Sequence, residues 1–311
     1  MIYLDSGATS LHKPPEVKRA MLHALDHCAN PGRGGYGAAM EAAAVVYGCR
    51  EQAGKLFGCH PEQVVFTANC THGLNIAINT LIKSGDRVLI SGFEHNAVTR
   101  PLHGLGARVQ VAGRRLFDWD HMLTEFEAGL RTGVDAAVFT HVSNVFGYVL
   151  PVEQLSVLCK QYAVPFIIDA AQSAGTQPVN LEQLGAAFIA MPGHKGLLGP
   201  QGTGLLLCGE TPKPLLRGGT GNQSVLQDMP ATKFSKDSLN GYFPKQHPVH
   251  PLLSYRCSCR LLQSQNDVHN IYCNPKVYHC IRFSHHYEYR YKISPNYPQD
   301  ISKRYLRTNS M

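Results

Sequence analysis

The stretch Met191-Pro192-Gly193-His194-Lys195-Gly196-Leu197-Leu198-Gly199-Pro200-Gln201-Gly202-Thr203-Gly204 places a lysine on a glycine-rich turn. The apolar runs on either side, residues 186–190 and 205–208, are typical of buried strands. A lysine at a strand end lies where open α/β sheets bind ligands. Partial burial beside His194 would lower the pKa of the Lys195 ammonium group, and the uncharged amine could then attack an aldehyde. An ordinary exposed loop lysine is the alternative, because short motifs recur by accident.

A second apolar run, Pro165-Phe166-Ile167-Ile168-Asp169-Ala170-Ala171-Gln172, contains an acid 26 residues before Lys195. Pyridoxal phosphate needs a lysine amine that condenses with its aldehyde and a carboxylate that keeps its ring nitrogen protonated. Asp169 and Lys195 form a matching pair of that kind. A strand-end aspartate is otherwise a helix cap or a turn residue.

Apolar periodicity predicts alternating strands and helices between residues 64 and 208. The expected helices cover residues 14–28, 38–57, 71–82, 122–130 and 151–163. The expected strands cover residues 64–66, 87–90, 108–111, 136–140, 165–169, 186–190 and 205–208. This alternation is typical of a mainly parallel sheet with helices on both faces.

Four segments in this order resemble the class V aminotransferase family and, within it, the cysteine desulfurases. They are Ile2-Tyr3-Leu4-Asp5-Ser6-Gly7-Ala8-Thr9-Ser10, Thr140-His141-Val142-Ser143-Asn144-Val145-Phe146-Gly147, Asp169-Ala170-Ala171-Gln172 and Gly193-His194-Lys195. The resemblance covers residues 1–231. It implies a pyridoxal 5'-phosphate cofactor and the fold-type-I large domain, an α/β fold with a seven-stranded, mainly parallel sheet.

The resemblance also implies roles for individual residues. Lys195 would hold the cofactor covalently, Asp169 would protonate its ring, and His95 would stack on the ring and move protons. These three are the expected catalytic residues. The expected cofactor-binding residues are Cys70, Thr71, His72, His95, Asn144, Asp169, Gln172, His194, Lys195 and Thr220.

Phosphate binding is expected at the start of the helix near residue 71, where free N–H groups and the helix dipole favour an anion. An ordinary Thr N-cap is the alternative there. By resemblance, Thr220 would donate to the phosphate in the partner subunit's site, and Ala8 and Asn144 would meet the substrate. The chain departs from the family at two points, because His72 stands where an acid is more usual and Pro192 where a serine is.

The resemblance ends before the family's mobile loop, which carries a persulfide-forming cysteine. None of the ten cysteines of the chain lies in a Gly-x-x-Cys-Ala context. The expected function is therefore a cysteine desulfurase-like lyase, converting L-cysteine to L-alanine with sulfur transfer, that is impaired in this chain. Another class V lyase or aminotransferase, or a non-catalytic fragment that binds the cofactor, are the alternatives.

Composition limits the partners. No run approaches 18 apolar residues and the chain does not open with a secretory signal, so neither a membrane span nor export is expected and the cytoplasm is the expected location. The cysteines are scattered, which predicts thiols and no metal site. The family's two-fold interface predicts a homodimer. A small amino acid, with cysteine first, and a sulfur-acceptor protein are the expected partners.

The charge is unevenly divided. Residues 1–231 hold 17 Lys and Arg against 18 Asp and Glu, a net charge of −1, whereas residues 232–311 hold 12 against 4, a net charge of +8. The basic balance thus belongs to the tail, and it does not predict a nucleic-acid partner for the rest. Tyr, His, Ser and Cys crowd in this tail without apolar periodicity, which predicts a poorly ordered segment unrelated to residues 1–231.

A change of reading frame near residue 231 would explain the tail, and a lineage-specific tail is the alternative. We expect one of the other two frames of the underlying DNA, beyond the codon for Ala231, to encode a continuation that contains a Gly-x-x-Cys-Ala loop. Translation of that DNA is the measurement. If neither frame encodes such a loop, the frame-change hypothesis is wrong.

Overall fold

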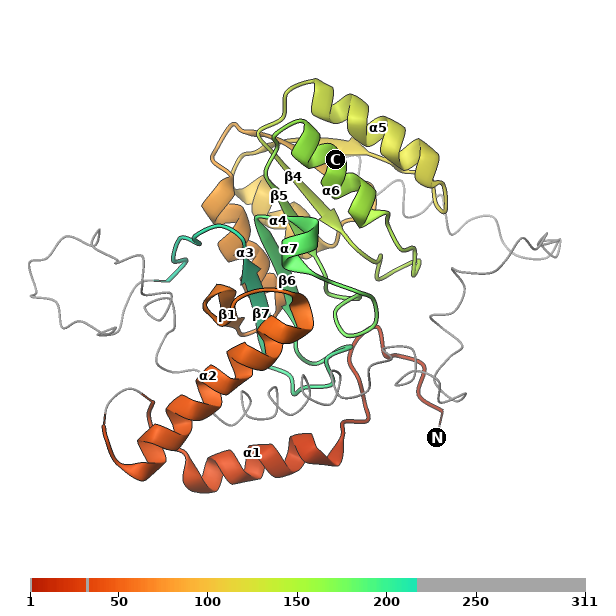
Figure 1. Ribbon diagram of the computed structural model, residues 1–311. Helices are drawn as coiled ribbons and strands as arrows, with labels where there is room; N and C mark the ends of the chain where they lie inside the picture. Colours follow the sequence, from red (N-terminus) through yellow and green to blue (C-terminus); the bar gives the residue numbers. More distant parts are fainter. Residues whose placement is uncertain (1, 32–33, 217–311) are drawn as a thin grey trace, which may run out of the picture. The chain divides into compact units, whose positions relative to one another are not determined.

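The computed structural model describes residues 2–31 and 34–216, and a seven-stranded sheet forms the centre of this part (Figure 1). The strands are β1 (Val64–Thr67), β2 (Arg87–Ser91), β3 (Arg108–Ala112), β4 (Ala136–Thr140), β5 (Phe166–Asp169), β6 (Phe188–Pro192) and β7 (Gly204–Cys208). Their order is β1-β7-β6-β5-β4-β2-β3. Strand β7 runs antiparallel to both β1 and β6, and the other four pairs are parallel, so the expected seven-stranded, mainly parallel sheet is confirmed.

Helices cover both faces of the sheet. They are α1 (Pro15–His27), α2 (Gly37–Phe57), α3 (Cys70–Leu81), α4 (Asn96–Gly104), α5 (Trp119–Arg131), α6 (Val152–Gln161) and α7 (Leu181–Leu184), with a short 3₁₀ turn at Pro61–Gln63. One face packs against α2, α5, α6 and α7, and the other against α3 and α4. Within the described part of the chain, no helix has both the length and the apolar character that a bilayer span requires.

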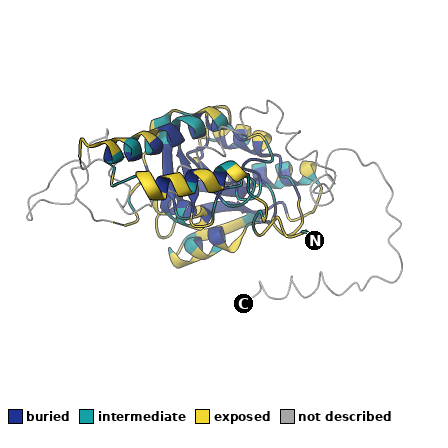
Figure 2. Cartoon of the chain, turned by 90° about the horizontal axis from the view of Figure 1, so that it is seen from below, coloured by how far each residue is buried: buried dark blue, intermediate teal, exposed yellow. Residues whose placement is uncertain are grey.

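Alternation along the strands builds these two layers. In β4, Ala137 and Phe139 belong to the cluster under α5 and α6, whereas Ala136 and Val138 belong to the cluster under α3 and α4. All five residues of β4 are buried, because a strand covered on both faces has no exposed side. Figure 2 shows the result as a dark blue sheet between helices whose outer faces are yellow.

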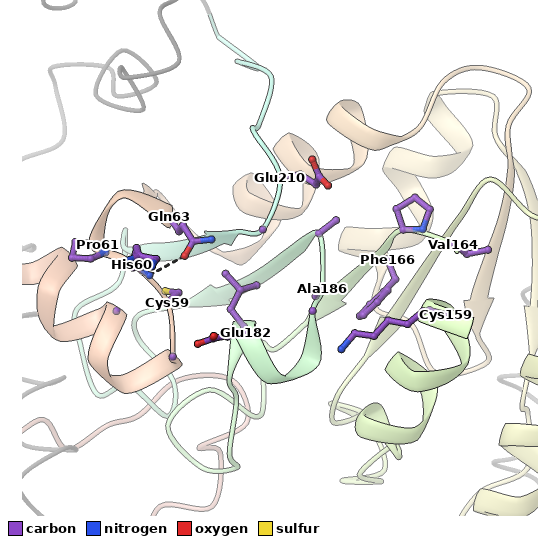
Figure 3. A pocket seen from close by; sticks show the side chains of 18 of the residues that line it. Cys59, His60, Pro61, Gln63, Cys159, Val164, Phe166, Glu182, Ala186 and Glu210 are labelled. Carbon is purple, nitrogen blue, oxygen red and sulfur yellow. Dashed lines mark hydrogen bonds between the residues drawn. The ribbon is translucent and has the colours of Figure 1, made fainter. Parts of the chain in front are cut away.

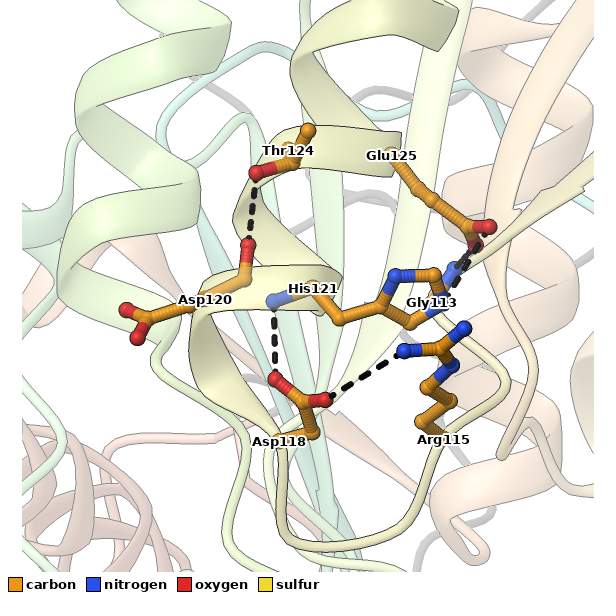
Figure 4. A network of polar contacts seen from close by, with 7 residues as sticks. All are labelled: Gly113, Arg115, Asp118, Asp120, His121, Thr124 and Glu125. Carbon is orange, nitrogen blue, oxygen red and sulfur yellow. Dashed lines mark hydrogen bonds and ion pairs between the residues drawn. The ribbon is translucent and has the colours of Figure 1, made fainter.

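A polar network fastens the start of α5 to the end of β3 (Figure 4). The Asp118 carboxylate accepts the His121 amide N–H at 2.9 Å, which caps the helix, and it lies 3.9 Å from Arg115. Four residues further along the helix, Glu125 accepts the Gly113 amide N–H at 2.6 Å and lies 3.2 Å from the His121 ring. These contacts fix the position of the first turns of α5, the helix that connects β3 to β4.

Two loops pack closely at the edge of the sheet where β5 and β6 end. Gly175 has a φ of +82°, which favours glycine, and a Cβ there would lie 2.5 Å from the Gly196 carbonyl oxygen. A Cβ on Gly196 would in turn lie 2.3 Å from the carbonyl oxygen of Ala174. The backbone that follows Asp169 and the backbone that carries Lys195 are therefore in direct contact.

The expected elements all occur, with ends displaced by up to about three residues at most sites. Two helices were not expected. Helix α4 contains Pro101, which removes one N–H from the helix interior, and α7 has only four residues. The expected boundary near residue 231, the basic tail and Thr220 lie outside the described residues.

We predict that Gly196→Ala destabilises the chain by about 1–3 kcal/mol, because the new methyl group meets backbone atoms rather than a movable side chain. Urea unfolding followed by circular dichroism measures this loss. Gly104→Ala is the matched control, since its Cβ would meet nothing within 4 Å and should leave the free energy of unfolding within about 1 kcal/mol. Equal losses in the two variants would contradict the close contact.

Candidate functional site

Asp169 lies at the centre of the candidate site. It is the last residue of β5 and is only 2% exposed. Its Oδ1 accepts the amide N–H of Ala171 at 2.9 Å and the Cys70 thiol, with Sγ at 3.4 Å. Among the described residues no hydrogen bond uses Oδ2. One carboxylate oxygen is thus held by the chain, and the other is left for an outside partner.

Burial raises the pKa of the Asp169 carboxyl group, because desolvation disfavours its charged form. The amide of Ala171, the thiol of Cys70 and the charges of His95 and Lys195 all act in the opposite direction. These four residues come from separate segments of the chain. The carboxylate is therefore the point at which the site's elements meet.

Lys195 follows β6 and is half-buried. Desolvation lowers the pKa of its ammonium group, although Asp169 and Cys70 act to raise it. No hydrogen bond within the described part of the chain uses Nζ. A desolvated amine without a fixed partner is the form that attacks an aldehyde most readily.

Cys70 joins the site from the first residue of α3. Its thiol is buried, and desolvation together with the Asp169 charge raises its pKa well above the ordinary value. It is therefore a neutral donor to Asp169. In the same turn, Asn69 accepts the His72 amide N–H at 2.8 Å and the Gly73 amide N–H at 3.2 Å. No hydrogen bond among the described residues uses the amides of Cys70 and Thr71, which are therefore available to an outside acceptor such as an anion.

The imidazole of His95 is oriented by its own backbone. Its Nδ1 accepts the Ala97 amide N–H at 3.0 Å, so His95 is the N-cap of α4. In the neutral ring, the proton then sits on Nε2. The residue is exposed, in the segment that follows the carboxyl end of β2, and no hydrogen bond within the described residues uses Nε2.

The N-terminal segment is fastened to the loop that carries Lys195. Thr9 Oγ1 and Ser10 Oγ donate to the His194 carbonyl oxygen at 3.1 and 2.9 Å, and Thr9 Oγ1 also lies 3.0 Å from His194 Nδ1. The Gln172 side chain donates to the Gly7 carbonyl oxygen at 2.9 Å. The Gly7–Ser10 backbone therefore forms one wall beside the predicted residues.

The structure brings some of the predicted residues together and leaves others apart. Cys70, His95 and Lys195 each interact with Asp169, and Thr71, His72, Gln172 and His194 lie within three residues of Cys70, Asp169 or Lys195 in sequence. Ala8 and Asn144 are exposed, and within the described residues no hydrogen bond joins Asn144 to this group. Thr220 lies outside the described residues.

The sequence patterns did not assign roles to Thr9, Ser10 or Glu94. Thr9 and Ser10 lie within the opening motif and Glu94 directly precedes His95, but nothing in their spacing indicates their contacts. Glu94 proves to have a carboxyl group enclosed by the protein, with Oε2 fully buried. No local pattern shows that a glutamate beside an exposed histidine turns inward.

A pocket of about 930 Å³ lies elsewhere (Figure 3). Its lining includes Cys59, His60, Lys160, Phe166, Glu182 and Glu210. Phe166 is the first residue of β5, whereas Asp169 is the last. The pocket therefore lies at the amino edge of β5, and the candidate site lies at the opposite, carboxyl edge.

The chain is similar to known proteins over most of its described part. The family description "Aminotransferase class-V" matches residues 2–235. A probable cysteine desulfurase from Methanothermobacter thermautotrophicus is 32% identical over 254 residues, which cover 77% of this chain and 63% of that protein. The cysteine desulfurase IscS from Pectobacterium carotovorum is 32% identical over 222 residues, covering 68% of this chain and 54% of that one.

Solved structures agree on the fold. The apo cysteine desulfurase from Thermococcus onnurineus NA1 has a TM-score of 0.72 at 30% identity, and the match covers 85% of this chain and 67% of that one. A structure described as SspA in complex with cysteine has a TM-score of 0.68 at 21% identity, covering 84% and 72% of the two chains, and supports the fold alone. The chain spans 57–63% of the length of three probable cysteine desulfurases that it matches. The match over residues 2–235 includes more than half of the chain, which therefore belongs to the class V aminotransferase family and resembles its cysteine desulfurases.

Proposed function

We propose that the chain binds pyridoxal 5'-phosphate at the carboxyl edge of the sheet and acts there as a cysteine desulfurase-like lyase. The observation that carries the proposal is the buried Asp169 carboxyl group in electrostatic contact with the half-buried Lys195. The Asp169 carboxyl group is an acid whose charged form a positively charged ring nitrogen would stabilise. The Lys195 side chain is an amine that can condense with an aldehyde.

The donors and acceptors of the site fit this cofactor. Asp169 Oδ2 and Lys195 Nζ make no hydrogen bond within the described residues, so both can meet a ligand. Cys70 and Thr71 are the first two residues of α3, and no hydrogen bond among the described residues uses their amides, so a phosphate group would be favoured at this helix start. His72 accepts the Ala68 amide N–H through Nδ1 at 3.2 Å, so its neutral ring presents a donor, Nε2–H, in place of the family's acid.

Each residue then has a defined task. The bound cofactor supplies a ring that draws electrons from the bond broken at the substrate's α-carbon. Asp169 holds a proton on the ring nitrogen, because the two opposite charges stabilise each other where water is excluded. Lys195 would hold the cofactor through Nζ, and once the substrate's amine had replaced Nζ on the cofactor, the freed amine would be able to take up or return the α-proton. His95 offers a second proton carrier at Nε2.

Cysteine is the substrate that the relatives suggest. Several proteins at 30–34% identity are named as cysteine desulfurases or probable ones. We infer that L-cysteine enters this site, with Ala8 and Asn144 as its contacts, and that the full reaction yields L-alanine and transfers sulfur to an acceptor protein. A homodimer, with Thr220 completing the partner subunit's site, and a cytoplasmic location belong to the same proposal.

Sulfur transfer requires a thiolate that attacks the substrate sulfur. Within the described part of the chain, the Cys70 thiol donates to Asp169, and it is held neutral by burial and by the Asp169 charge. Burial also raises the pKa of the Cys59 thiol to about 11 and that of Cys159 to about 12. The chain's 311 residues include no Gly-x-x-Cys-Ala sequence. We therefore propose that this chain holds cofactor and cysteine but transfers sulfur poorly, and the missing motif favours a non-catalytic cofactor-binding role as the second candidate.

We predict that borohydride reduction attaches the cofactor to Lys195. Peptide mass spectrometry of the reduced protein should find the added mass on the peptide that contains Lys195, and the Lys195→Arg variant should lose both this mass and the visible absorbance. Arginine keeps the positive charge but cannot form the covalent bond. Lys160→Arg, on the remote helix α6, is the matched control and should keep both signals. Absence of cofactor from the unaltered chain would overturn the proposed function.

We further predict that L-cysteine changes the visible spectrum of the loaded protein without sustained release of alanine. Alanine should stay at or below about one equivalent per site, because within the described residues burial raises the pKa of the Cys28, Cys59, Cys70, Cys159 and Cys208 thiols and disfavours the thiolate that would receive the sulfur. The measurement is quantification of alanine beside the absorbance titration, with L-alanine as the control ligand. Many turnovers would show that another group takes the sulfur, and an unchanged spectrum would exclude cysteine as the ligand.

A further inference from the structure

Strands β2 and β4 separate at the carboxyl edge of the sheet. Their parallel pairing ends at Ile90 and Val138, whereas β2 continues to pair with β3 up to Ser91. The next segments leave toward opposite faces, because α4 packs with one core cluster and α6 with the other. This is the point at which the strand order reverses, and such points form the binding crevice of open α/β sheets.

Glu94 closes the gap between these two strands. Its Oε1 accepts the amide N–H of Thr140 at 2.8 Å and also accepts the hydroxyl of Ser91. Thr140 lies two residues beyond the end of the β2–β4 pairing, so a side-chain oxygen takes the place of a missing backbone acceptor. Glu94 is partly exposed as a residue, yet Oε2 is fully enclosed and has no hydrogen-bond partner in the described part of the chain.

We propose that Glu94 is a positioning residue that bridges β2 and β4 through Ser91 and Thr140 and thereby fixes the loops that carry His95 and Asn144. His95 is the next residue in the chain, and Asn144 follows Thr140 by four. The bridge itself depends only on the contacts of Glu94. Its consequence for His95 as a proton carrier rests on the proposed function.

The carboxyl group of Glu94 acts as a neutral acid below about pH 8. Burial raises its pKa to about 8, the charge of Asp169 adds to this effect, and the bonds from Ser91 and Thr140 oppose it. His141, beside Thr140, is buried and stays neutral because burial lowers its pKa to about 4. Asp169 is therefore the charged group that acts on Glu94, and a neutral Glu94 adds no second negative charge beside it.

Amide exchange tests the bridge without any cofactor. Glu94→Ala should exchange the Thr140 amide hydrogen about tenfold faster, because one hydrogen bond is lost, while Glu94→Gln keeps the acceptor and should stay within about twofold. Asp135→Ala is the matched control, since Asp135 accepts the Arg87 amide N–H at 2.7 Å at the opposite end of the same strand pair. It should expose the Arg87 amide and leave that of Thr140 unchanged. An unchanged Thr140 amide in Glu94→Ala would overturn the proposal.

The pH dependence of unfolding tests the neutral acid. The folded pKa lies above that of an unfolded glutamate, so the wild-type chain loses stability as pH rises from about 4.5 to about 8. Glu94→Gln removes the titrating carboxyl group and with it this pH-dependent loss. The stability of the variant relative to the wild type should therefore increase as pH rises across that interval. The wild-type chain should also show an infrared band of a protonated carboxylic acid that Glu94→Gln lacks. A constant difference between the two chains, with no such band, would show that Glu94 is ionised.

The loaded protein tests the effect on the site. Glu94→Ala should alter the pH profile of the bound cofactor's absorbance, whereas Glu94→Gln should restore the wild-type profile and Asp135→Ala should not change it. If cofactor binds and all three profiles coincide, the positioning role is wrong. If no variant and no wild-type protein binds cofactor, the proposed function fails, while the exchange and infrared results still decide whether Glu94 forms the bridge.

Discussion

The burial of the Asp169 carboxyl group is the constraint around which this part of the chain is built. Ionising an acid inside protein is costly unless donors and positive charges compensate it. Here the compensation comes from the amide of Ala171, the thiol of Cys70 and the charges of His95 and Lys195. Cys70, His95 and Lys195 belong to segments other than the one that carries Asp169. The charged form of Asp169 is therefore stabilised only when β5, α3 and the segments after β2 and β6 are all in place.

The strand order explains why residues distant in sequence can serve one acid. Strand β5 lies between β4 and β6, and all three are parallel, so the loops that follow them leave from one edge. The loop after β6 then packs on the turn after β5 through Gly175 and Gly196. The Gly7–Ser10 segment adds a wall by bonding to His194 and Gln172. A local sequence pattern becomes a site only through this topology.

The elements of the fold could be predicted because their signal is local. Continuous apolar runs such as Ile167-Ile168 announce strands buried on both faces, and the structure confirms them. Helix α4 could not be predicted in the same way, because Pro101 and its short length hide its periodicity. The pairing of Asp169 with Lys195 was predictable from chemistry. The inward turn of Glu94 was not predictable, because it depends on a gap between strands β2 and β4. These strands are neighbours in the sheet, but the start of β4 at Ala136 lies 45 residues after the end of β2 at Ser91.

Two acids thus lie at one edge of the sheet, and different neighbours act on their pKa values. At Asp169, an amide, a thiol and the charges of His95 and Lys195 act to lower the pKa, against the larger effect of burial. Glu94 has hydrogen bonds from Ser91 and Thr140, but the charge that acts on it is that of Asp169, which is repulsive. Two close carboxylates in a low-dielectric region do not ionise together readily. Burial raises the pKa of both carboxyl groups, and for Glu94, whose shift includes no positive neighbour, the pKa reaches about 8, so this acid keeps its proton at neutral pH and can serve as an uncharged link between strands.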